Sequence, residues 1–361
     1  MNYHRFSVDN DEVSIPLIPD LKKLYIELTT KCNYSCITCI RHSWQDPLTS
    51  LSKAAIDKLI CDMSELPQLK TIHLGGFGEP LMHPHAIEMI ETCKQKGYEV
   101  EMITNGSYLT KDLSRQLVDI GLDWIYVSLD GADDDSFSGI RPGASFSEVT
   151  SNILQLQEIK QKYNKQFPKL GVEFVATKKN FNRLANMRKL INKLGAHRFI
   201  ITNVLPYHES MKDQILYDPA DFNKGFDLPV QPIYKTIPEM QLRTQRTCNF
   251  VTNKAMAITA QGYVSPCYAF MHSYDCYILG RKKHSDAYYF GNIAEQSLAD
   301  IWMKPEYARF RWLVKHSLYP SCTDCRQVDG CATAQTNEID CWGNQPSCAD
   351  CLWARNIVLC P

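Results

Sequence analysis

The chain has 361 residues and a formal net charge of −1, with 22% charged and 44% hydrophobic residues. This length allows one large α/β domain and a smaller one, and the near-zero charge argues against a nucleic-acid-binding surface. The first residues, MNYHRFSVDNDEVS, lack a signal peptide's apolar segment, and no apolar run is long enough to span a membrane. We therefore expect a cytoplasmic protein without nucleic-acid or membrane partners.

Strand-like runs alternate with helical patterns after an N-terminal extension, residues 1–22. The six predicted strands span residues 23–30, 71–76, 98–104, 123–130, 169–176 and 197–204. The expected helix N-caps are Ser52, Thr110 and Ser145, and the glycines expected to end helices are Gly97, Gly121 and Gly195. This alternation predicts parallel strands with right-handed crossovers over residues 23–205.

Six strand–helix units predict an α/β fold, either an open doubly wound sheet or a partial (β/α)6 barrel. Both architectures place the active site at the carboxyl ends of the strands. A proline-spaced stretch follows, and we interpret residues 206–247 as a connector. Residues 248–361 contain short elements separated by cysteines, so we expect metal, rather than a conventional apolar core, to hold them together.

The 15 cysteines are distributed unevenly along the chain. A disulfide framework is not expected in a reducing cytosol. Cys61 and Cys93 lie beside apolar helical positions, and we expect both to pack in the core. The other cysteines are clustered, which indicates metal binding.

Three thiols follow the first predicted strand in the sequence TTKCNYSCITCI. Cys32, Cys36 and Cys39 have the spacing CxxxCxxC, which is one ligand short of a usual structural zinc site. On a cubane [4Fe–4S] cluster, three thiolates leave one iron free to bind a small molecule. A zinc site with a distant fourth ligand is the alternative.

This cysteine motif resembles the radical S-adenosylmethionine (SAM) superfamily. The resemblance implies a partial (β/α)6 TIM-like barrel in which the three cysteines bind a [4Fe–4S] cluster that cleaves SAM to a 5′-deoxyadenosyl radical. The sequence GGFGEP after the second strand is similar to the family's GGE motif, at Gly78 and Glu79. The resemblance implies further SAM contacts, at Thr104, Asn105, Ser128, Asp130 and Arg141. Thr177 and Asn203 lie at equivalent positions, and Tyr207 and His208 are candidate substrate-facing groups.

The C-terminal cysteines resemble the SPASM extension of radical SAM enzymes, which binds two auxiliary [4Fe–4S] clusters. The implied ligands are Cys248, Cys267, Cys322, Cys325, Cys331, Cys341, Cys348 and Cys351. The resemblance groups Cys248, Cys267 and Cys341 at one cluster. It places Cys322, Cys325, Cys331 and either Cys348 or Cys351 at the other. Zinc ribbons are the alternative for the CxxC pairs.

These motifs together predict a maturase that abstracts hydrogen from a peptide, a protein or an enzyme-bound cofactor. The segments LPYHES and NQPSCADCLWARNIVLCP resemble radical SAM maturases of tungsten-pterin oxidoreductases. The resemblance also implies an electron donor such as ferredoxin or flavodoxin. The alternatives are a ribosomal-peptide-modifying or sulfatase-maturating enzyme, a non-catalytic iron–sulfur or zinc scaffold, and a conventional barrel enzyme with a structural zinc.

Overall fold

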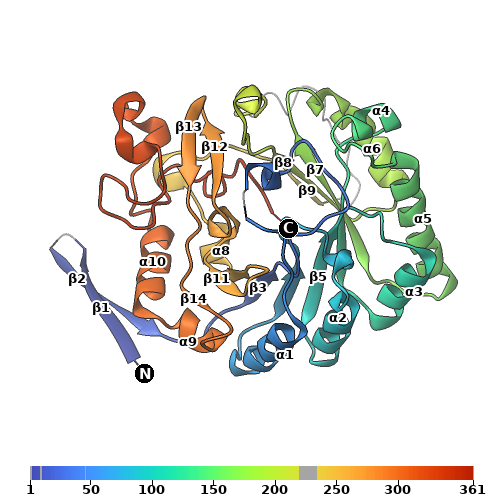
Figure 1. The fold of residues 1–361 in the computed structure, drawn as a ribbon, viewed down its shortest axis with the longest axis horizontal. Helices are drawn as coiled ribbons and strands as arrows, with labels where there is room; N and C mark the ends of the chain where they lie inside the picture. The colour runs from blue at the N-terminus through green and yellow to red at the C-terminus, as the bar shows by residue number, and fades with distance from the viewer. Residues whose placement is uncertain (1, 9, 45, 219–233, 361) are drawn as a thin grey trace.

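Six parallel strands form the centre of the computed structural model, which describes residues 2–8, 10–44, 46–218 and 234–360. They are β3 (Lys23–Ile26), β4 (Thr71–Leu74), β5 (Glu99–Thr104), β6 (Trp124–Ser128), β7 (Lys169–Ala176) and β8 (Arg198–Asn203). Each pairs in parallel with the next strand in the chain. Helices lie on the outer side of this curved sheet (Figure 1). The partial (β/α)6 barrel predicted from the sequence is confirmed.

Three of the helices between these strands begin at the predicted caps, and the three predicted glycines each lie within two residues of a helix end. The helices are α1 (Lys53–Asp62), α2 (Ala86–Gln95), α3 (Lys111–Ile120), α4 (Asp134–Ser138), α5 (Phe146–Lys162) and α6 (Leu184–Lys193). The side chains of Ser52, Thr110 and Ser145 each accept a hydrogen bond from a first-turn backbone N–H. Gly121 ends α3 in the left-handed region at φ 77°, a conformation that costs glycine little.

The two helical cysteines behave differently from each other. Cys93 is completely buried on the inner face of α2, as predicted. Cys61 is exposed, so the prediction that it packs in the core is wrong. It lies five residues after the buried Ile56, which is about 140° around an α-helix, and it therefore points away from the face that contacts the sheet.

The C-terminal third extends the main sheet and shares its core, contrary to expectation. Strand β10 (Ala255–Ile258) pairs in parallel with β3, and β11 (Tyr263–Ser265) and β14 (Gly291–Asn292) continue the same edge. The helices of this part are α8 (Asn249–Thr252), α9 (Leu298–Trp302) and α10 (Pro305–Lys315). Buried residues of β10, α9 and α10 belong to the main hydrophobic cluster. The four-residue run AMAI was too short to identify as a buried strand from periodicity.

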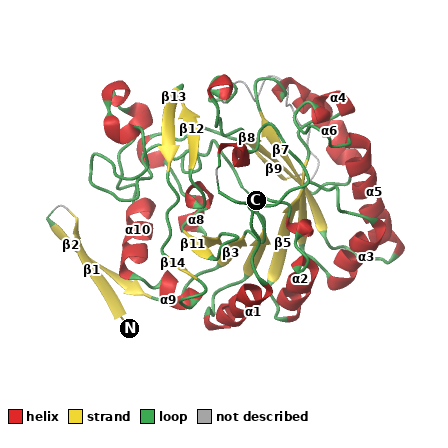
Figure 2. Ribbon diagram, viewed as in Figure 1, coloured by secondary structure: helices red, strands yellow, loops and turns green. Residues whose placement is uncertain are grey.

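Two hairpins lie outside the ten-stranded sheet (Figure 2). The N-terminal hairpin pairs β1 (Asn2–Val8) with β2 (Asp11–Leu17), and Phe6 packs edge-on against Trp312 of α10. The second pairs β12 (Tyr274–Ile278) with β13 (Arg281–Ser285). In the predicted connector, residues 219–233 lie outside the described part of the chain, and β9 (Tyr234–Thr236) pairs with β8.

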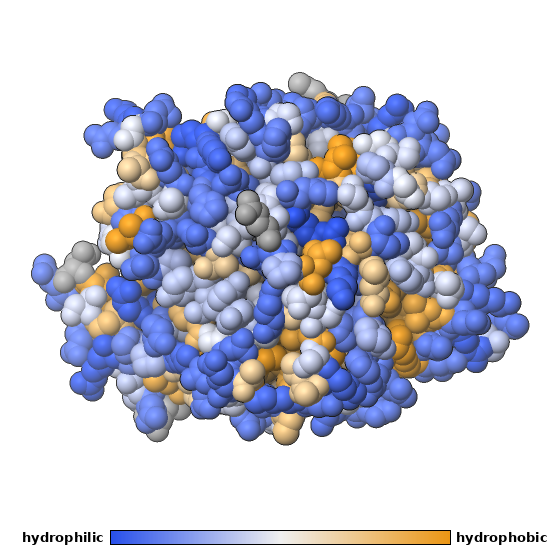
Figure 3. Space-filling model, viewed as in Figure 1, coloured by the Kyte–Doolittle hydropathy of each residue, from blue (hydrophilic) through white to orange (hydrophobic). Residues whose placement is uncertain are grey.

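The molecular surface in Figure 3 is mostly hydrophilic, with apolar residues in several separate groups. None of the helices that the structure describes combines the length and apolar character that crossing a lipid bilayer requires.

Candidate functional site

The three cysteines of the CxxxCxxC loop line one cavity at the carboxyl ends of the strands. The cavity has a volume of about 260 Å³. Arg41 fixes the loop, because its guanidinium donates to the backbone carbonyls of Thr30 and Tyr34 at 2.8 and 3.0 Å. The Asn105 amide lies 3.8 Å from the Cys32 sulfur. Three thiols facing one cavity, with an N–H donor beside a sulfur, fit the ligands of an iron–sulfur cluster.

The loop after β4 packs directly against the cysteine loop. A Cβ atom on Gly78 would lie 2.0 Å from the carbonyl oxygen of Thr29, so only glycine fits there. The next residue, Glu79, donates its backbone N–H to the carbonyl of Lys31 at 2.8 Å. Gly78 permits this close approach, and the segments after β3 and β4 therefore form one wall of the cavity.

The Glu79 carboxylate is buried and accepts three hydrogen bonds. Thr104 Oγ1 and the backbone N–H groups of Leu81 and Asn105 donate to it at 2.8, 3.2 and 2.7 Å. Burial raises the pKa of Glu79 to about 7 despite these donors. A ligand ammonium group would supply the missing positive charge and favour the carboxylate.

Arg141 lines the cavity, whereas its partner Asp130 does not. Both Nε and an NH2 group of Arg141 lie 2.8 Å from Asp130 Oδ2. Burial opposes the charge of Arg141, but Asp130, Cys36 and Glu173 together outweigh burial and raise the guanidinium pKa above its ordinary value. Asp130 also accepts the backbone N–H of Val175 at 2.8 Å. Asp130 therefore orients Arg141 instead of facing the cavity.

The other residues predicted at the strand ends also fall into two sets, those that line the cavity and those that do not. Those that line the cavity are Gly78, Thr104, Asn105, Ser128 and Asn203. Thr177 is buried outside the cavity lining and hydrogen-bonds Asn180. Tyr207 donates to the carbonyl of Ile37 at 2.8 Å, and His208 is exposed. Tyr207 therefore supports the cysteine loop.

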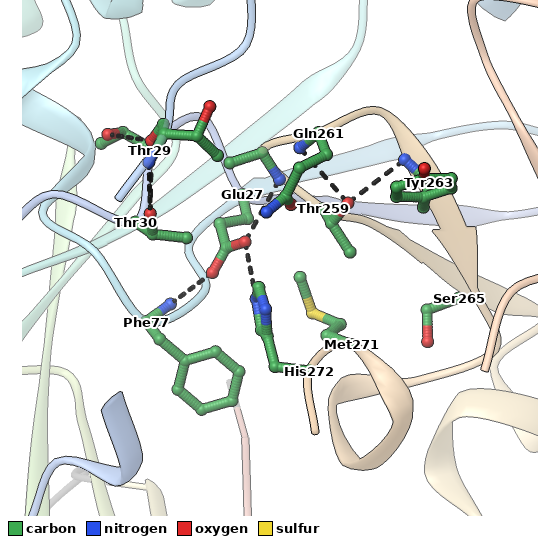
Figure 4. A network of polar contacts seen from close by, with 12 residues as sticks. Glu27, Thr29, Thr30, Phe77, Thr259, Gln261, Tyr263, Ser265, Met271 and His272 are labelled. Atoms are coloured by element: carbon green, nitrogen blue, oxygen red, sulfur yellow. Dashed lines mark hydrogen bonds and ion pairs between the residues drawn. The ribbon is translucent and has the colours of Figure 1, made fainter. Parts of the chain in front are cut away.

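A buried carboxylate, Glu27, connects the cavity wall to the C-terminal part of the chain (Figure 4). It follows β3 and accepts hydrogen bonds from Phe77 N and Ala260 N at 3.1 and 3.2 Å, and it contacts His272 Nε2 at 2.9 Å. The His272 ring stacks on Trp44 at a centroid distance of 3.9 Å. The loop after β4, which we call the glycine loop, and the segment after β10 are thus held by one side chain.

The C-terminal tail enters the cavity, which the sequence did not predict. Four tail residues line it, namely Trp353, Val358, Leu359 and Cys360. The backbone N–H of Leu359 donates to Thr202 Oγ1 at 2.7 Å, which ties the tail to β8. A short apolar segment after the last cysteine pair carried no signal of this contact.

Two ionisable residues on the strands were also missed. His73 on β4 and Glu173 on β7 line the cavity and are buried. The sequence did contain a signal for these two residues, because strands buried on both faces consist almost entirely of apolar residues. A histidine in TIHL and a glutamate in KLGVEFVA are exceptions that point to the barrel interior.

Eight C-terminal thiols gather as two groups. The inner thiol group contains Cys248, Cys267, Cys348 and Cys351. Burial, first, and then the other three thiols raise the pKa of Cys267 well above its ordinary value. The outer thiol group contains Cys322, Cys325, Cys331 and Cys341. Within the described residues, no three His, Cys, Asp or Glu side chains are arranged to hold a single metal ion.

This grouping differs from the one implied by the SPASM resemblance, which placed Cys341 with Cys248 and Cys267. Asp340 explains the difference, since its carboxylate accepts from the backbone N–H groups of Trp342 and Asn344 at 2.9 and 3.1 Å. The resulting turn presents Cys341 at the outer thiol group. Cys348 lies beyond this turn in the main core.

Two family models match this chain. The radical SAM superfamily matches residues 26–167, and the SPASM iron–sulfur cluster-binding domain matches residues 248–326. Both matches cover cysteines described above: the first includes the CxxxCxxC loop, and the second includes Cys248, Cys267, Cys322 and Cys325.

Among curated proteins, the tungsten-containing aldehyde ferredoxin oxidoreductase cofactor-modifying protein of Pyrococcus furiosus is 37% identical over 94% of this chain and 97% of its own length. The PqqA peptide cyclase of Methylocella silvestris is 25% identical, over 80% of this chain and 76% of its own.

Among solved structures, Streptococcus suis SuiB bound to the precursor peptide SuiA has a TM-score of 0.64 at 15% identity, covering 87% of this chain and 72% of SuiB. Native anSMEcpe with bound AdoMet has a TM-score of 0.59 at 15% identity, covering 84% of this chain and 87% of that protein. At this identity the structures show a shared fold. The relative that matches almost the whole chain, together with the two family models, shows that this protein belongs to the radical SAM superfamily and carries a SPASM iron–sulfur cluster-binding domain.

Proposed function

We propose that this radical SAM enzyme is a maturase that acts on the cofactor of a tungsten-containing oxidoreductase. The observation that carries the proposal is the 37% identity to the cofactor-modifying protein, which extends over nearly the full length of both chains. The PqqA peptide cyclase is less similar and covers less of the chain, so peptide modification is the weaker candidate.

A radical SAM domain implies a [4Fe–4S] cluster and SAM, and a SPASM domain implies auxiliary clusters. We assign the first cluster to Cys32, Cys36 and Cys39. When bound, the cluster and SAM supply a carbon-centred 5′-deoxyadenosyl radical that takes a hydrogen atom from the substrate. We assign the auxiliary clusters to the inner and outer thiol groups, whose four cysteines each provide the complete ligand set of a [4Fe–4S] cluster.

The chain's own residues would bind and orient SAM. Glu79 would accept its ammonium group, and Arg141 would pair with its carboxylate through the N–H groups that Asp130 leaves free. Thr104 and Asn105 hold the Glu79 carboxylate in place. Gly78 lets the two loops meet, and Ser128 adds a hydroxyl to the same wall. The tail residues that line the cavity, Leu359 among them, would help to exclude water from the radical.

We propose the same division of the chain that the sequence suggested. Residues 1–22 are the N-terminal extension, residues 23–205 the radical SAM barrel, residues 206–247 the connector and residues 248–361 the SPASM-type unit. The proposed partners are a protein-bound cofactor and an electron donor such as ferredoxin or flavodoxin. A reducing cytoplasm is the proposed location, because the clusters require reduced thiols.

The test is SAM cleavage by anaerobically reconstituted protein after chemical reduction. We expect 5′-deoxyadenosine from the wild type and none from Cys36→Ala, while Cys93→Ala, which removes a buried thiol outside the cavity, should retain activity. A second experiment incubates the protein with the immature tungsten oxidoreductase and measures activation of that enzyme. Absence of 5′-deoxyadenosine would support a non-catalytic scaffold, and cleavage without activation would reject the tungsten oxidoreductase as the target.

A further inference from the structure

Part of the cavity is lined by polar side chains that have no role in the proposed SAM site. We call this set the polar wall, and it consists of His73, Glu173, Tyr268 and Cys360. The first three are at least nine-tenths buried, with exposed fractions of 0, 9 and 7%. The Tyr268 hydroxyl lies within electrostatic range of Cys360 and Glu173, which line the same cavity.

Several polar atoms of this wall have no partner in the protein. His73 Nε2 and the Tyr268 hydroxyl are buried without any hydrogen bond. The Glu173 carboxyl also has no hydrogen-bond partner among the described residues. Buried polar groups are normally hydrogen-bonded, and each one left unpaired destabilises the fold. Because all three side chains line one cavity, a ligand bound there can supply the missing partners.

The hydrogen-bonding character of His73 follows from its neighbours. Its Nδ1 lies 3.2 Å from Glu101, which also contacts Lys23 at 2.6 Å. Burial opposes ionisation of Glu101, but the contacts with His73 and Lys23 lower the pKa of Glu101 to about 2. Burial lowers the pKa of His73, so the ring is neutral and donates from Nδ1 to the Glu101 carboxylate. Nε2 therefore presents a lone pair beside Gly75, at the cavity end of β4.

Glu173 presents both a donor and an acceptor. Burial, followed by the charge of Asp130, raises the pKa of Glu173 to about 8, so the group is a neutral acid at pH 7. The hydroxyl of Tyr268 can also donate or accept. The wall therefore combines acceptors and donors without a net charge, and it offers no counterion to a phosphate or an ammonium group.

Aromatic rings flank this neutral wall. Phe77, Tyr268 and Trp353 line the same cavity, and the rings of Phe77 and Tyr268 meet edge-on at a centroid distance of 5.9 Å. Such surfaces favour flat ligands, because ring faces contact ring faces or edges without steric gaps. Small-molecule pockets are typically lined by apolar and aromatic side chains together with a few placed polar groups.

We propose that the polar wall binds a planar, uncharged heterocycle with both N–H donors and carbonyl or ring-nitrogen acceptors, the chemical class of pterins and purines. The proposal rests on the proposed function only in taking this cavity as the reaction chamber. Two sources of this chemistry exist, since SAM itself carries adenine. We assign the wall to the second reactant, because it is separate from the residues assigned to SAM.

The experiment measures binding of pterin to the anaerobically reconstituted protein by fluorescence, with and without saturating SAM. We expect pterin to bind in both conditions. Tyr268→Phe should weaken it about 3- to 10-fold, the effect of losing one neutral hydrogen bond. Glu173→Leu should weaken it about tenfold or more, whereas Glu173→Gln keeps a donor and an acceptor and should bind nearly as wild type.

Tyr307→Phe is the matched control, because its hydroxyl is also buried but lies outside this cavity. It should leave pterin binding unchanged. The proposal is overturned if the wild type does not bind pterin, if Tyr268→Phe has no effect, or if saturating SAM displaces the ligand. SAM cleavage is measured on the same samples, so its loss identifies failure of the proposed function, and intact cleavage without pterin binding identifies failure of this inference alone.

Discussion

At the level of single residues, the Glu79 carboxyl group accepts several hydrogen bonds and still has a raised pKa. It is 2% exposed, and it accepts three hydrogen bonds, yet its pKa is raised to about 7. Burial therefore has a larger effect on this carboxyl group than the donors around it. A carboxyl group with a pKa near 7 readily loses its proton when a cationic ligand binds beside it.

The first prediction concerns the pH dependence of SAM binding. A carboxylate is needed to pair with the SAM ammonium group, and Glu79 with a pKa of about 7 is mostly protonated at pH 6 and mostly ionised at pH 8. SAM affinity should therefore increase roughly tenfold from pH 6 to pH 8. Calorimetry on the wild type and on Glu79→Gln tests this, since the variant should bind weakly and without that pH dependence. Equal pH profiles would contradict the assignment.

The same raised pKa has the opposite effect on folding. A folded protein whose carboxyl group has a pKa above the unfolded value holds its proton more tightly than the unfolded chain does. Its contribution to stability is thus present below the unfolded pKa near 4.5 and is lost as pH rises through about 7. This sign separates Glu79 from salt-bridged acids such as Glu101, whose lowered pKa favours the fold at neutral pH.

The second prediction concerns Gly78, whose missing Cβ allows two loops to meet. Gly78→Ala places a carbon 2.0 Å from a backbone oxygen, so one of the loops must move. We expect SAM binding to weaken by about tenfold or more, because a displacement of this size breaks the contacts of Glu79. Gly330→Ala has open space around the new Cβ and should bind SAM normally. Unchanged affinity in Gly78→Ala would show that the glycine loop is not part of the site.

At the level of elements, the site depends on strand ends that come from both halves of the chain. β10 pairs with the N-terminal side of the barrel at β3, and Glu27 follows β3 directly. Its carboxylate joins the loop after β4 to the segments after β10. The barrel and the cysteine-rich part therefore share a sheet and a buried polar network.

The third prediction follows from this network. Glu27→Ala leaves the buried Ala260 N–H and His272 ring, and the partly buried Phe77 N–H, without an acceptor. Each unpaired buried group costs about 1–3 kcal/mol, so the free energy of unfolding should fall by about 3 kcal/mol or more. Glu65→Ala, at an exposed glutamate, should change it by less than about 0.5 kcal/mol. Denaturant unfolding measures both variants, and equal stabilities would refute the role of Glu27.

Elements with a clear periodicity were predictable from sequence, and elements defined by their partners were not. The run DWIYVSLD identified β6, and Ser145 marked the start of α5, because local composition and capping determine both. Strand β10 is four residues long and becomes a strand only beside β3. The cysteine loop was recognisable from the spacing of its cysteines. The position of Cys360 in the cavity lining depends instead on how the C-terminal tail folds back onto the barrel.

At the level of the whole molecule, eleven of the cysteines form three centres. Cys32, Cys36 and Cys39 line the cavity, the inner thiol group belongs to the main core, and the outer thiol group lies around Cys322 and Cys331 in a small separate cluster. Burial raises the pKa of Cys248 to about 12, so the inner thiols would be protonated without a metal. Metal binding must therefore release protons there, which couples cluster assembly to folding.

The last prediction tests which thiols share a cluster, and it uses pairs of substitutions because single losses do not identify partners. Reconstituted wild type should contain about 12 irons, four per [4Fe–4S] cluster. Cys348→Ala and Cys341→Ala should each lose about four. In the Cys348→Ala background, Cys248→Ala should remove no further iron, because both ligate the inner cluster, whereas Cys341→Ala should remove about four more. Iron analysis and Mössbauer spectroscopy measure these losses. If Cys248→Ala and Cys341→Ala instead fail to add to each other, the two residues share one cluster, and the grouping derived from the fold is wrong.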